Sequence, residues 1–484
     1  MSQQGYKPMQ SLKNRLSKWI FETDIFKEQA IYLVGGCVRD IILKRHAQDI
    51  DLCCANARQL AYALAKEKGA VCVVMDKKPN VPCFRLINRK FPEDYIDLTE
   101  IRDHVIESDL KQRDFTVNAM AIPLASGQFD PSMIIDIVDG QGDLKNKIIR
   151  QVSPNAFVDD PLRMLRAFRF SAQLDFSIDP KTIKNIHTHA TKIKTVSSER
   201  ILFELKLLFR VSNILTHIEA MDKTGLLSAI FPEIEALKNC DQNYYHHTTV
   251  WGHSLEALKA YENLLTQVKS LFKTTADQLM DFLNQDDHIA LIKMACLFHD
   301  IAKPSTRNVD AETNRITFFK HDKAGRNEIE IICDRLRLSK KNSLFLCTLV
   351  EEHLHIRDLL KPGTRQKTIL KSIRKLGEVI VAITLLSIAD KQATRGVKSS
   401  SKDRQMYQDK AIQFIESYYN DIQPVICTKN LITGKHLMEC GVKPGPVMGK
   451  LLRIVREAQD EGKISTPSEA IELAKEHFKN MEQV

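Results

Sequence analysis

The hydrophobic positions in the first third of the chain form short runs separated by polar and glycine-containing turns. Between Ile31 and about Gly140 these β-rich runs read IYLVGG, IDLCC, VCVVM, CFRLI, YIDLT and IIDIVDG. Runs of this kind predict strands. A stretch with apolar residues at helical spacing, NARQLAYALAKEKG, lies among them. The pattern predicts an α/β or α+β domain in this part of the chain.

The pattern changes after Gly140, where strand-like runs nearly vanish. From about residue 155 the apolar residues recur at helical spacing, as in PLRMLRAFRFSAQL and ERILFELKLLF, which predicts an almost entirely helical body. The uncharged run VIVAITLLSIA at 379–389 predicts a buried helix, because it is far shorter than the roughly 18 residues that span a bilayer. A Gly, Ser and Lys cluster at 396–404 predicts a break. The predicted fold class is α+β, a small mixed head on a long helical body.

Length, charge and cysteine content place modest limits on the number of domains, the class of partner and the location of the protein. A chain of 484 residues is long enough for about three domains, and a net charge of +9 favours a polyanionic partner such as nucleic acid. The 11 cysteines form no CxxC pair, which argues against a zinc knuckle or a disulfide framework. The start MSQQGYKPMQ lacks the apolar core of a signal peptide. We therefore expect a cytoplasmic protein without a membrane segment.

The segment LVGGCVRDIILKRHAQDIDLCC, residues 33–54, carries the first candidate chemistry. Residues i and i+2 of a strand point to one face, so Asp49 and Asp51 are expected to project together from a strand. Two neighbouring carboxylates repel each other unless a cation lies between them. Mg²⁺ meets that need, because it accepts carboxylate oxygens and leaves positions for phosphate oxygens. Both aspartates are therefore candidate catalytic residues and magnesium ligands.

The glycines of the same segment suit the approach of a triphosphate. Gly35 and Gly36 lack Cβ atoms, so backbone amides there can come close to phosphate oxygens. A helix expected to start near Val38 would offer its positive end to the same phosphates. Arg39 adds a charge-assisted contact. Taken singly, the aspartates also fit an exposed strand end and the glycines an ordinary turn.

The combination of these features is more specific than either alone. Gly-Gly closing one strand and Asp-x-Asp on the next resembles the layout of the nucleotidyltransferase superfamily that contains DNA polymerase β. That resemblance implies a third carboxylate. Asp97 in YIDLT is the candidate, although a strand aspartate near a sheet edge is as often simply solvated.

Further motifs follow in order: RDFTVNAMA at 113–121, DDPLRMLRAFRF at 159–170 and SERILFE at 198–204. With the first segment they resemble class II tRNA nucleotidyltransferases and bacterial poly(A) polymerases. The resemblance implies Mg²⁺-dependent, template-independent addition of C and A from CTP and ATP to the 3′ end of tRNA. The expected domains are a nucleotidyltransferase head (1–150), a helical neck that selects the base (151–215), a helical body (216–400) and a tail (401–484).

In this family an Asp-x-x-Arg pair selects the base, and Asp160 and Arg163 occupy its positions. On a helix, residues three apart are neighbours. A carboxylate accepts from an exocyclic amine while a guanidinium donates to a ring nitrogen, which suits cytosine and adenine but not uracil or guanine. Relatives use the positions of Arg166 and Arg169 for nucleotide contacts, and that of Arg113 for the incoming nucleotide.

A plainer interpretation of PLRMLRAFRF is an amphipathic helix whose arginines face solvent, and it is compatible with nucleotide binding on the basic face. Gln112 replaces the first arginine of the family's RRDFT motif. Glu199, Arg200 and Glu204 are expected to form a structural ion network without a chemical role.

The resemblance also points to a missing loop. Family members that build the complete CCA end carry a flexible loop between the strand of YIDLT and the RRDFT motif, and relatives restricted to CC addition carry a shortened one. Here only about EIRDHVIES intervenes. This favours CC addition.

Downstream, His253, His299 with Asp300, and Asp390 resemble the ligand set of an HD domain. Imidazole and carboxylate ligands from separate helices suit a divalent ion that activates water on a phosphate, so a second divalent metal is expected. His321 in FFKHDKAG and His353 in EEHLHI also lie where HD relatives hold histidines. A single histidine is more often a surface or core residue. An adjacent His-Asp pair after an apolar helix is more specific.

The segment at 431–464 resembles the carboxy-terminal segment of HD-bearing family members, and it fits either an RNA contact or a helix hairpin that caps the body. The leading hypothesis is a tRNA nucleotidyltransferase. A poly(A) polymerase of the same family is the first alternative, but PNVPCFRLINRK lacks the Gly-Arg-Arg-Phe-like strand of those enzymes. The second alternative is an HD-type metal-dependent phosphohydrolase that acts on nucleotides or RNA ends. A third possibility, a noncatalytic RNA-binding protein, is disfavoured because the carboxylates of both candidate centres are intact.

Overall fold

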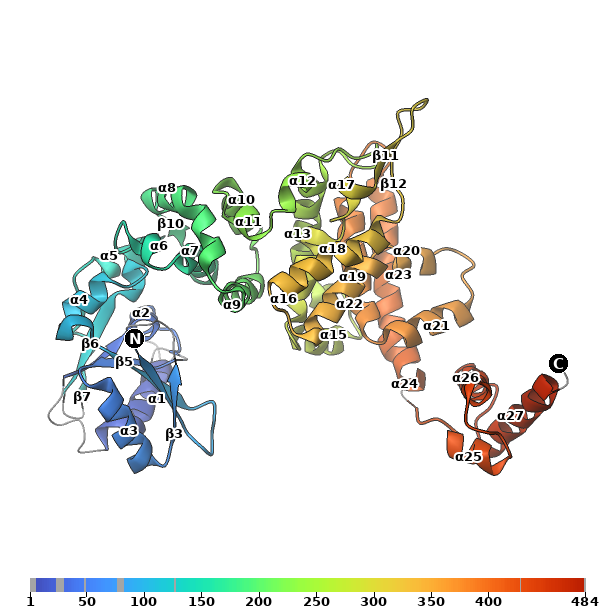
Figure 1. The fold of residues 1–484 in the computed structure, drawn as a ribbon, viewed down its shortest axis with the longest axis horizontal. Helices are drawn as coiled ribbons and strands as arrows, with labels where there is room; N and C mark the ends of the chain where they lie inside the picture. Colours follow the sequence, from blue (N-terminus) through green and yellow to red (C-terminus); the bar gives the residue numbers. More distant parts are fainter. Residues whose placement is uncertain are drawn as a thin grey trace. The chain divides into compact units, whose positions relative to one another are not determined.

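The computed structural model describes residues 6–22, 30–47, 49–75, 82–125, 128–426 and 428–482. The chain divides into two compact units, Met1–Pro232 and Glu233–Val484. The mixed sheet lies in the first unit, and the second is helical apart from a short hairpin (Figure 1). The α+β fold class is thereby confirmed, whereas the finer division into four domains stays a prediction.

The sheet of the first unit has the strand order β3-β4-β5-β2-β1-β6-β7, with β8 paired to β6. The β2–β5 pair is parallel and the other pairs are antiparallel. Every strand-like run of the sequence forms a strand here. The strands are β1 (Ile31–Val34), β2 (Asp51–Cys54), β3 (Val71–Met75), β4 (Cys83–Ile87), β5 (Tyr95–Glu100), β6 (Met120–Ala125), β7 (Gln128–Phe129) and β8 (Ile135–Asp136).

Strand β6 was not predicted from the sequence. Its residues MAIPLA include Pro123, which pairs with Tyr32 of β1, and a proline argues against a strand when the pattern is considered alone. Burial explains why the strand forms: Ala121 and Ile122 are completely buried. Packing against β1 outweighs the local preference.

Helices cover the sheet and continue into the neck. The α-helices of this unit are α1 (Tyr6–Leu16), α2 (Gly36–Ile42), α3 (Ala57–Lys68), α4 (Ile106–Lys111), α5 (Gly140–Asn146), α6 (Ala156–Asp159), α7 (Leu162–Leu174), α8 (Pro180–His189), α9 (Ser198–Phe209), α10 (Leu215–Lys223) and α11 (Leu226–Ile230). Helix α3 confirms the helical pattern of NARQLAYALAKEKG. Helix α2 begins at Gly36, two residues earlier than the expected start near Val38.

Helices α7 and α9 of the neck are joined by buried ion pairs. Arg166 contacts Asp114 at 2.6 Å and Glu204 at 3.3 Å, and Arg169 contacts Glu204 at 2.5 Å. Burial alone would raise the pKa of Asp114, but the guanidinium groups of Arg166 and Arg163 outweigh it and hold this pKa well below its usual range. Glu204 thus forms structural ion pairs as expected, but its partners are Arg166 and Arg169 of α7, whereas Arg200 of the expected network contacts Asp160. The contact of Arg166 with Asp114 ties the neck to the segment that follows α4.

Replacing Asp114 by asparagine is expected to lower the free energy of unfolding by about 3 kcal/mol at pH 7, the scale for breaking a buried ion pair. Because the folded pKa is depressed, this stabilisation is fully present above the unfolded pKa of about 3.9 and is lost as the pH falls through the folded value. Urea unfolding of both proteins at pH 7, 5 and 3 measures the difference. It should be equal at pH 7 and 5 and smaller at pH 3, and a constant difference would contradict the assignment.

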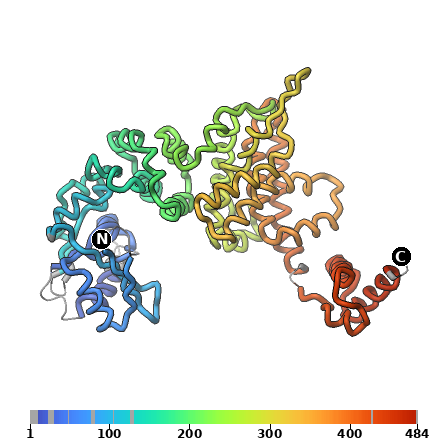
Figure 2. Tube along the Cα trace, in the orientation of Figure 1, coloured from blue at the N-terminus to red at the C-terminus, as the bar shows by residue number. Residues whose placement is uncertain are grey.

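The second unit is a packed set of helices. Helices α13 (Val250–Thr266), α16 (His288–Phe298), α19 (Lys340–Glu352) and α22 (Val379–Ala393) lie side by side, as the trace in Figure 2 shows. The run VIVAITLLSIA lies in α22 and is almost wholly buried, as predicted. The other α-helices before the last cluster are α12 (Ile234–Lys238), α14 (Val268–Leu271), α15 (Ala276–Asn284), α17 (Lys303–Thr306), α18 (His321–Arg335), α20 (His355–Leu359), α21 (Gln366–Leu376), α23 (Ser401–Ser417) and α24 (Gln423–Ile426).

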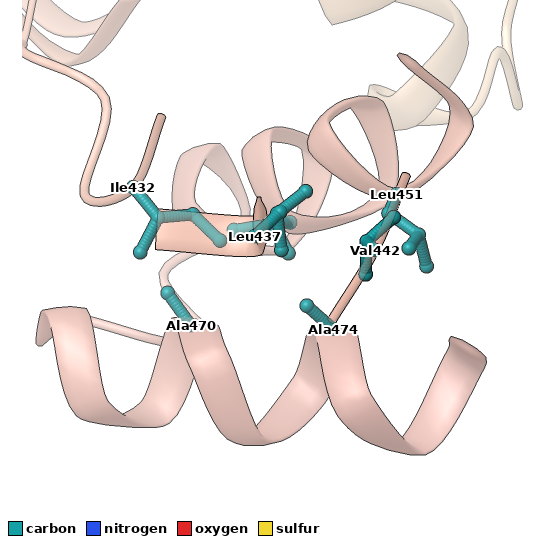
Figure 3. Packing of buried hydrophobic residues seen from close by; sticks show 7 residues of the cluster. Ile432, Leu437, Val442, Leu451, Ala470 and Ala474 are labelled. Carbon is teal, nitrogen blue, oxygen red and sulfur yellow. The ribbon is translucent and has the colours of Figure 1, made fainter. Parts of the chain in front are cut away.

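The predicted break at 396–404 falls at the end of α22 and the start of α23, and the chain beyond it ends in a small helical cluster. Helices α25 (Gly434–Glu439), α26 (Pro446–Asp460) and α27 (Pro467–Glu482) enclose their own apolar centre, part of which is drawn in Figure 3: Ile432, Leu437, Val442, Leu451, Val455, Ala470 and Ala474. None of the helices in the described ranges has the length and apolar character needed to cross a bilayer. The cysteines of the same ranges are free thiols.

Candidate active sites

The two candidate magnesium ligands lie at the amino end of central strand β2. The expectation that both belong to one strand is wrong, because β2 begins at Asp51 and Asp49 precedes it. A different contact brings the exposed Asp49 to the same face: the phenol of Tyr95 donates to Asp49 Oδ1 at 2.5 Å. Tyr95 lies two residues before Asp97, which pairs in register with Asp51. Both carboxylates therefore face the same side of the sheet.

The glycine turn between β1 and α2 adjoins these carboxylates. Gly35 has a φ of 76°, a conformation that favours glycine, and a Cβ there would lie 3.1 Å from Arg113 Nη1 and 3.6 Å from Asp51 Oδ2. A Cβ on Gly36 would lie 3.3 Å from Arg39 Nη2. The missing side chains thus leave room around one carboxylate and two arginines, all three of which are predicted residues of the nucleotide site.

Acidic or amide partners orient both arginines. Arg39 donates to Asn118 Oδ1 at 2.8 Å and contacts Asp40 at 2.9 Å, and Arg113 contacts Asp109 at 2.9 Å. Their side chains are 12% and 22% exposed. Partly buried guanidinium groups beside a glycine turn are suited to bind phosphate, because fewer rotamers remain to be ordered on binding.

Asp97 does not present a carboxylate for a third metal contact. Arg85 donates to both of its oxygens at 2.8 Å, and Asp97 is only 3% exposed. This hydrogen bonding raises the pKa of Arg85. The guanidinium of Arg85 also lies 4.1 Å from the ring centroid of Tyr95. Neither Arg85 nor Tyr95 was identified from sequence, since their contacts depend on the register of β4, β5 and the segment before β2.

A backbone hydrogen bond joins the proposed base-selecting pair, from the Arg163 amide to the Asp160 carbonyl oxygen at 3.0 Å. Asp160 lies between α6 and α7, so its expected position on a helix is wrong. Its carboxylate accepts from Arg200 at 3.0 Å, whereas Arg163 donates to the carbonyl oxygen of Gln112 at 2.6 Å. Arg200, expected to have only structural contacts, therefore touches a residue assigned to base selection.

Arg166 and Arg169 lie inside the ion network described above. With Arg39 they surround the ring of Phe170, at centroid distances of 5.1, 3.9 and 5.4 Å. These contacts connect the neck with α2 of the head. Nucleotide binding by Arg166 and Arg169 stays a prediction.

A second centre lies in the second unit and brings together the residues predicted to form an HD site. His253 lies on α13, His299 ends α16 next to Asp300, and Asp390 lies on α22. His253 Nε2 is 3.0 Å from Asp390 Oδ1, and His299 Nε2 is 3.2 Å from Asp300 Oδ2. The ligand atoms of His253, His299 and Asp390 form one compact group.

Two more histidines complete a second group around the same aspartate. His321, the first residue of α18, places Nε2 3.2 Å from Asp300 Oδ1. His353, at the end of α19, places Nε2 3.7 Å from the same oxygen. Asp300 therefore faces histidines of both groups. The positions noted in FFKHDKAG and EEHLHI thus belong to this centre.

Backbone contacts set the tautomers of three of these imidazoles. The Nδ1 atoms of His299, His321 and His353 lie 3.1, 2.8 and 2.7 Å from carbonyl oxygens three residues earlier. If Nδ1 carries the proton and donates it there, Nε2 keeps a lone pair directed at the centre. The Nε2 atoms of all three are buried without a hydrogen-bond partner. Buried lone pairs that converge in this way fit a metal centre.

The carboxylates of the centre are held in their charged form. Burial alone would raise the pKa of Asp300, but His299 and Lys303 lower it well below the usual range. Burial lowers the pKa of His353 to about 4. Lys303 contacts Asp300 Oδ2 at 2.7 Å and is itself buried. Ionised carboxylates and neutral imidazoles are the forms that bind divalent ions, and Asp300 and His353 fit them. At His299 burial lowers the pKa, but the carboxylate of Asp300 outweighs burial and raises it, so an ion would compete with a proton at that imidazole.

Models of known protein families match the segments of the chain that hold the two centres. The family model described as Poly A polymerase head domain matches residues 31–150, and the model described as HD domain matches residues 250–391. The model of an RNA and SrmB- binding site of polymerase A matches residues 175–238, between them. A model of tRNA nucleotidyltransferase domain 2 matches residues 327–474.

Individual relatives span almost the whole chain. The A-adding tRNA nucleotidyltransferase of Deinococcus radiodurans is 30% identical over 447 residues, covering 90% of this chain and 93% of the relative. The CC-adding tRNA nucleotidyltransferase of Synechocystis is 27% identical, covering 97% and 98%. Among solved structures, the Thermotoga maritima CCA-adding enzyme complexed with tRNA aligns with a TM-score of 0.59 at 21% identity, covering 97% of this chain and 95% of that chain. This last likeness supports the fold.

Proposed function

The chain belongs to the tRNA nucleotidyltransferase family, and from this premise we propose that it adds two cytidylates to the 3′ end of tRNA with CTP as substrate. In the reaction the terminal 3′ hydroxyl attacks the α-phosphate of the nucleotide, a new phosphodiester bond forms and pyrophosphate leaves. The net charge of +9 suits a polyanionic substrate.

The candidate residues of the head and the neck have the following proposed roles in this reaction. Asp49 and Asp51 would hold Mg²⁺, which supplies charge stabilisation and positions the reacting oxygens. Arg39 and Arg113 bind phosphate oxygens beside the glycine turn. Asp160 accepts from the exocyclic amine of the base and Arg163 donates to its ring nitrogen, which requires Asp160 to share or exchange its contact with Arg200.

One observation carries the choice of CC addition. Between the end of β5 at Glu100 and Arg113, the chain forms a 3₁₀ turn (Arg102–His104) followed by helix α4. Ile106 and Leu110 of α4 are buried in a cluster with residues of β1, β2 and β6. The segment is therefore packed against the sheet. A packed segment supports a pocket of fixed shape, which suits repeated use of one nucleotide.

Incubation of the purified protein with tRNA that lacks its CCA end, together with CTP and ATP, tests this function. Sequencing of the products is expected to find two added cytidylates, with kcat/KM for CTP at least about 100-fold above that for ATP, a difference of ~2.7 kcal/mol. A tRNA that already ends in CC should gain nothing from ATP. Adenylate on that substrate would instead indicate A addition, and long adenylate tracts on unstructured RNA would indicate a poly(A) polymerase.

The second centre supports a second activity, metal-dependent hydrolysis of phosphate esters on nucleotides or RNA ends. Four histidines and two aspartates converge there, and the buried Nε2 atoms of His299, His321 and His353, which have no hydrogen-bond partner, carry this proposal. An imidazole-rich donor set favours first-row transition ions over Mg²⁺. When bound, such an ion would supply an activated water, while Lys303 could contact a phosphate oxygen.

A further inference from the structure

We propose that Tyr95 is a positioning residue of the nucleotidyltransferase site, which holds the carboxylate of Asp49 in the orientation that metal binding requires. The proposal rests on the function proposed above. Its central observation is the hydrogen bond of 2.5 Å from the phenol of Tyr95 to Asp49 Oδ1. A charge-assisted O–H to carboxylate contact of this length is among the stronger hydrogen bonds of proteins.

Asp49 needs such support more than Asp51 does. Asp51 is the first residue of β2 and pairs in register with β5, so its backbone is fixed by the sheet. Asp49 lies outside the strand and is exposed. A solvent-exposed carboxylate rotates among its rotamers, and fixing it for an ion costs conformational free energy. The phenol restricts that rotation before an ion arrives.

Tyr95 is itself firmly held. The guanidinium of Arg85 lies over its ring at 4.1 Å, and both oxygens of Asp97 fix that guanidinium at 2.8 Å. Arg15 of α1 donates to the carbonyl oxygen of Tyr95 at 3.1 Å. The neighbouring Asp94 accepts from Lys18 at 2.8 Å and from Trp19 at 3.0 Å. Contacts from β4, β5 and the amino-terminal helix thus restrict the movement of Tyr95.

The register of the sheet explains how these groups reach Asp49. Arg85 of β4 is the cross-strand partner of Asp97, and Asp97 is the partner of Asp51. Tyr95 lies two residues before Asp97 and so on the same face. The row Arg85, Asp97 and Asp51 runs across three adjacent strands, and Tyr95 extends it toward Asp49. In this arrangement Asp97 anchors Arg85 and is not a metal ligand.

The hydrogen bond also gives the two oxygens of Asp49 different roles. Oδ1 accepts from the phenol, and Oδ2 would be the oxygen that binds an ion. Loss of a group that orients a metal ligand typically lowers metal affinity or activity by about 10–100-fold. The expected loss is therefore one of ion binding, which excess ion can restore.

The variant Tyr95→Phe tests the proposal because it removes only the hydroxyl. In full-length protein with tRNA and CTP, it is expected to raise the Mg²⁺ concentration for half-maximal rate by about 10-fold. The maximal rate at saturating Mg²⁺ should return to within about 3-fold of wild type, and the KM for tRNA should not change. Tyr62→Phe on α3 is the matched control, since Tyr62 is exposed and contacts only the edge of Phe84 among aromatic rings of the described residues.

A second variant separates positioning from folding. Arg85→Gln removes the support of the ring and should shift the Mg²⁺ requirement in the same direction, and the double variant should shift it no further than the larger single effect. Thermal unfolding checks that each variant folds, and the affinity of the protein alone for Mn²⁺, measured by titration without tRNA or CTP, should fall by about the same factor as the Mg²⁺ requirement rises. A Tyr95→Phe protein with the wild-type Mg²⁺ requirement, or with a rate loss that Mg²⁺ does not restore, would overturn the positioning role. Absence of nucleotide addition by the wild-type protein would instead refute the proposed function.

Discussion

Replacement of Asp49 and Asp51 together by alanine is expected to reduce the incorporation of CTP into tRNA by about 10³-fold or more. The two carboxylates are the proposed magnesium ligands of the head, and loss of the ion removes several kcal/mol of charge stabilisation from the transition state. Single-turnover measurements with labelled CTP and tRNA lacking its CCA end give the rate. The fold should persist, because Asp49 is exposed and Asp51 is half-buried at the end of its strand.

Controls for this variant come from the same unit and from the other centre. Glu107→Ala removes an exposed acid from α4, near the site in sequence, and should leave incorporation unchanged. Phosphate-ester hydrolysis, if the second centre catalyses it, should also persist, because its ligands lie in a separate compact unit. Incorporation that survives the double replacement would refute the assignment of the head.

Replacement of Asp300 by asparagine should abolish metal binding and hydrolysis at the second centre and leave nucleotide addition intact. Asp300 lies 3.2 Å from both His299 and His321, so it faces both groups of candidate ligands. An amide has no negative charge to bind a divalent ion, and the histidines then lose their shared carboxylate. We expect metal content to fall to background and hydrolysis of bis-p-nitrophenyl phosphate in the presence of Mn²⁺ or Ni²⁺ to fall by at least about 100-fold.

Nucleotide addition should persist in this variant, since Asp300 belongs to the second unit. The matched control is Asp334→Asn, an exposed aspartate on α18. Elemental analysis of both purified variants measures the bound metal, and so distinguishes loss of metal binding from loss of catalysis with the metal still bound. A variant of Asp300 that keeps its metal and its hydrolysis would contradict the centre as described.

The strands and the candidate ligands of the head could be predicted because their signals are local. The β-rich runs before Gly140 all form strands, and the Asp-x-Asp and Gly-Gly motifs lie together as expected. The reason given for the shared face of Asp49 and Asp51 was wrong, however. Strand alternation does not apply at Asp49, and the contact with Tyr95 depends on a strand more than forty residues later, which no local pattern reveals.

The side-chain partners of the neck were harder to predict for the same reason. Helical spacing placed Asp160 next to Arg163, but the helix begins only after Asp160, and its carboxylate contacts Arg200 on α9 instead. In the second unit, the adjacent His299 and Asp300 gave a strong local signal. Their completion by His321 depends on the packing of α18 against α19 and near the turn that follows α16, which is a tertiary property.

The helix α4 that occupies the place of a longer loop has a consequence for the maturation of tRNA. A recognition site with few accessible conformations loses little conformational entropy when its substrate binds. The same site cannot change shape to accept adenine, a purine larger than cytosine. If the protein adds only cytidylates, as proposed above, the acceptor stems that leave it still lack the terminal adenylate. A partner adenylyltransferase must then add the terminal adenylate before aminoacylation. Two polypeptides would thus share a task that other enzymes complete alone.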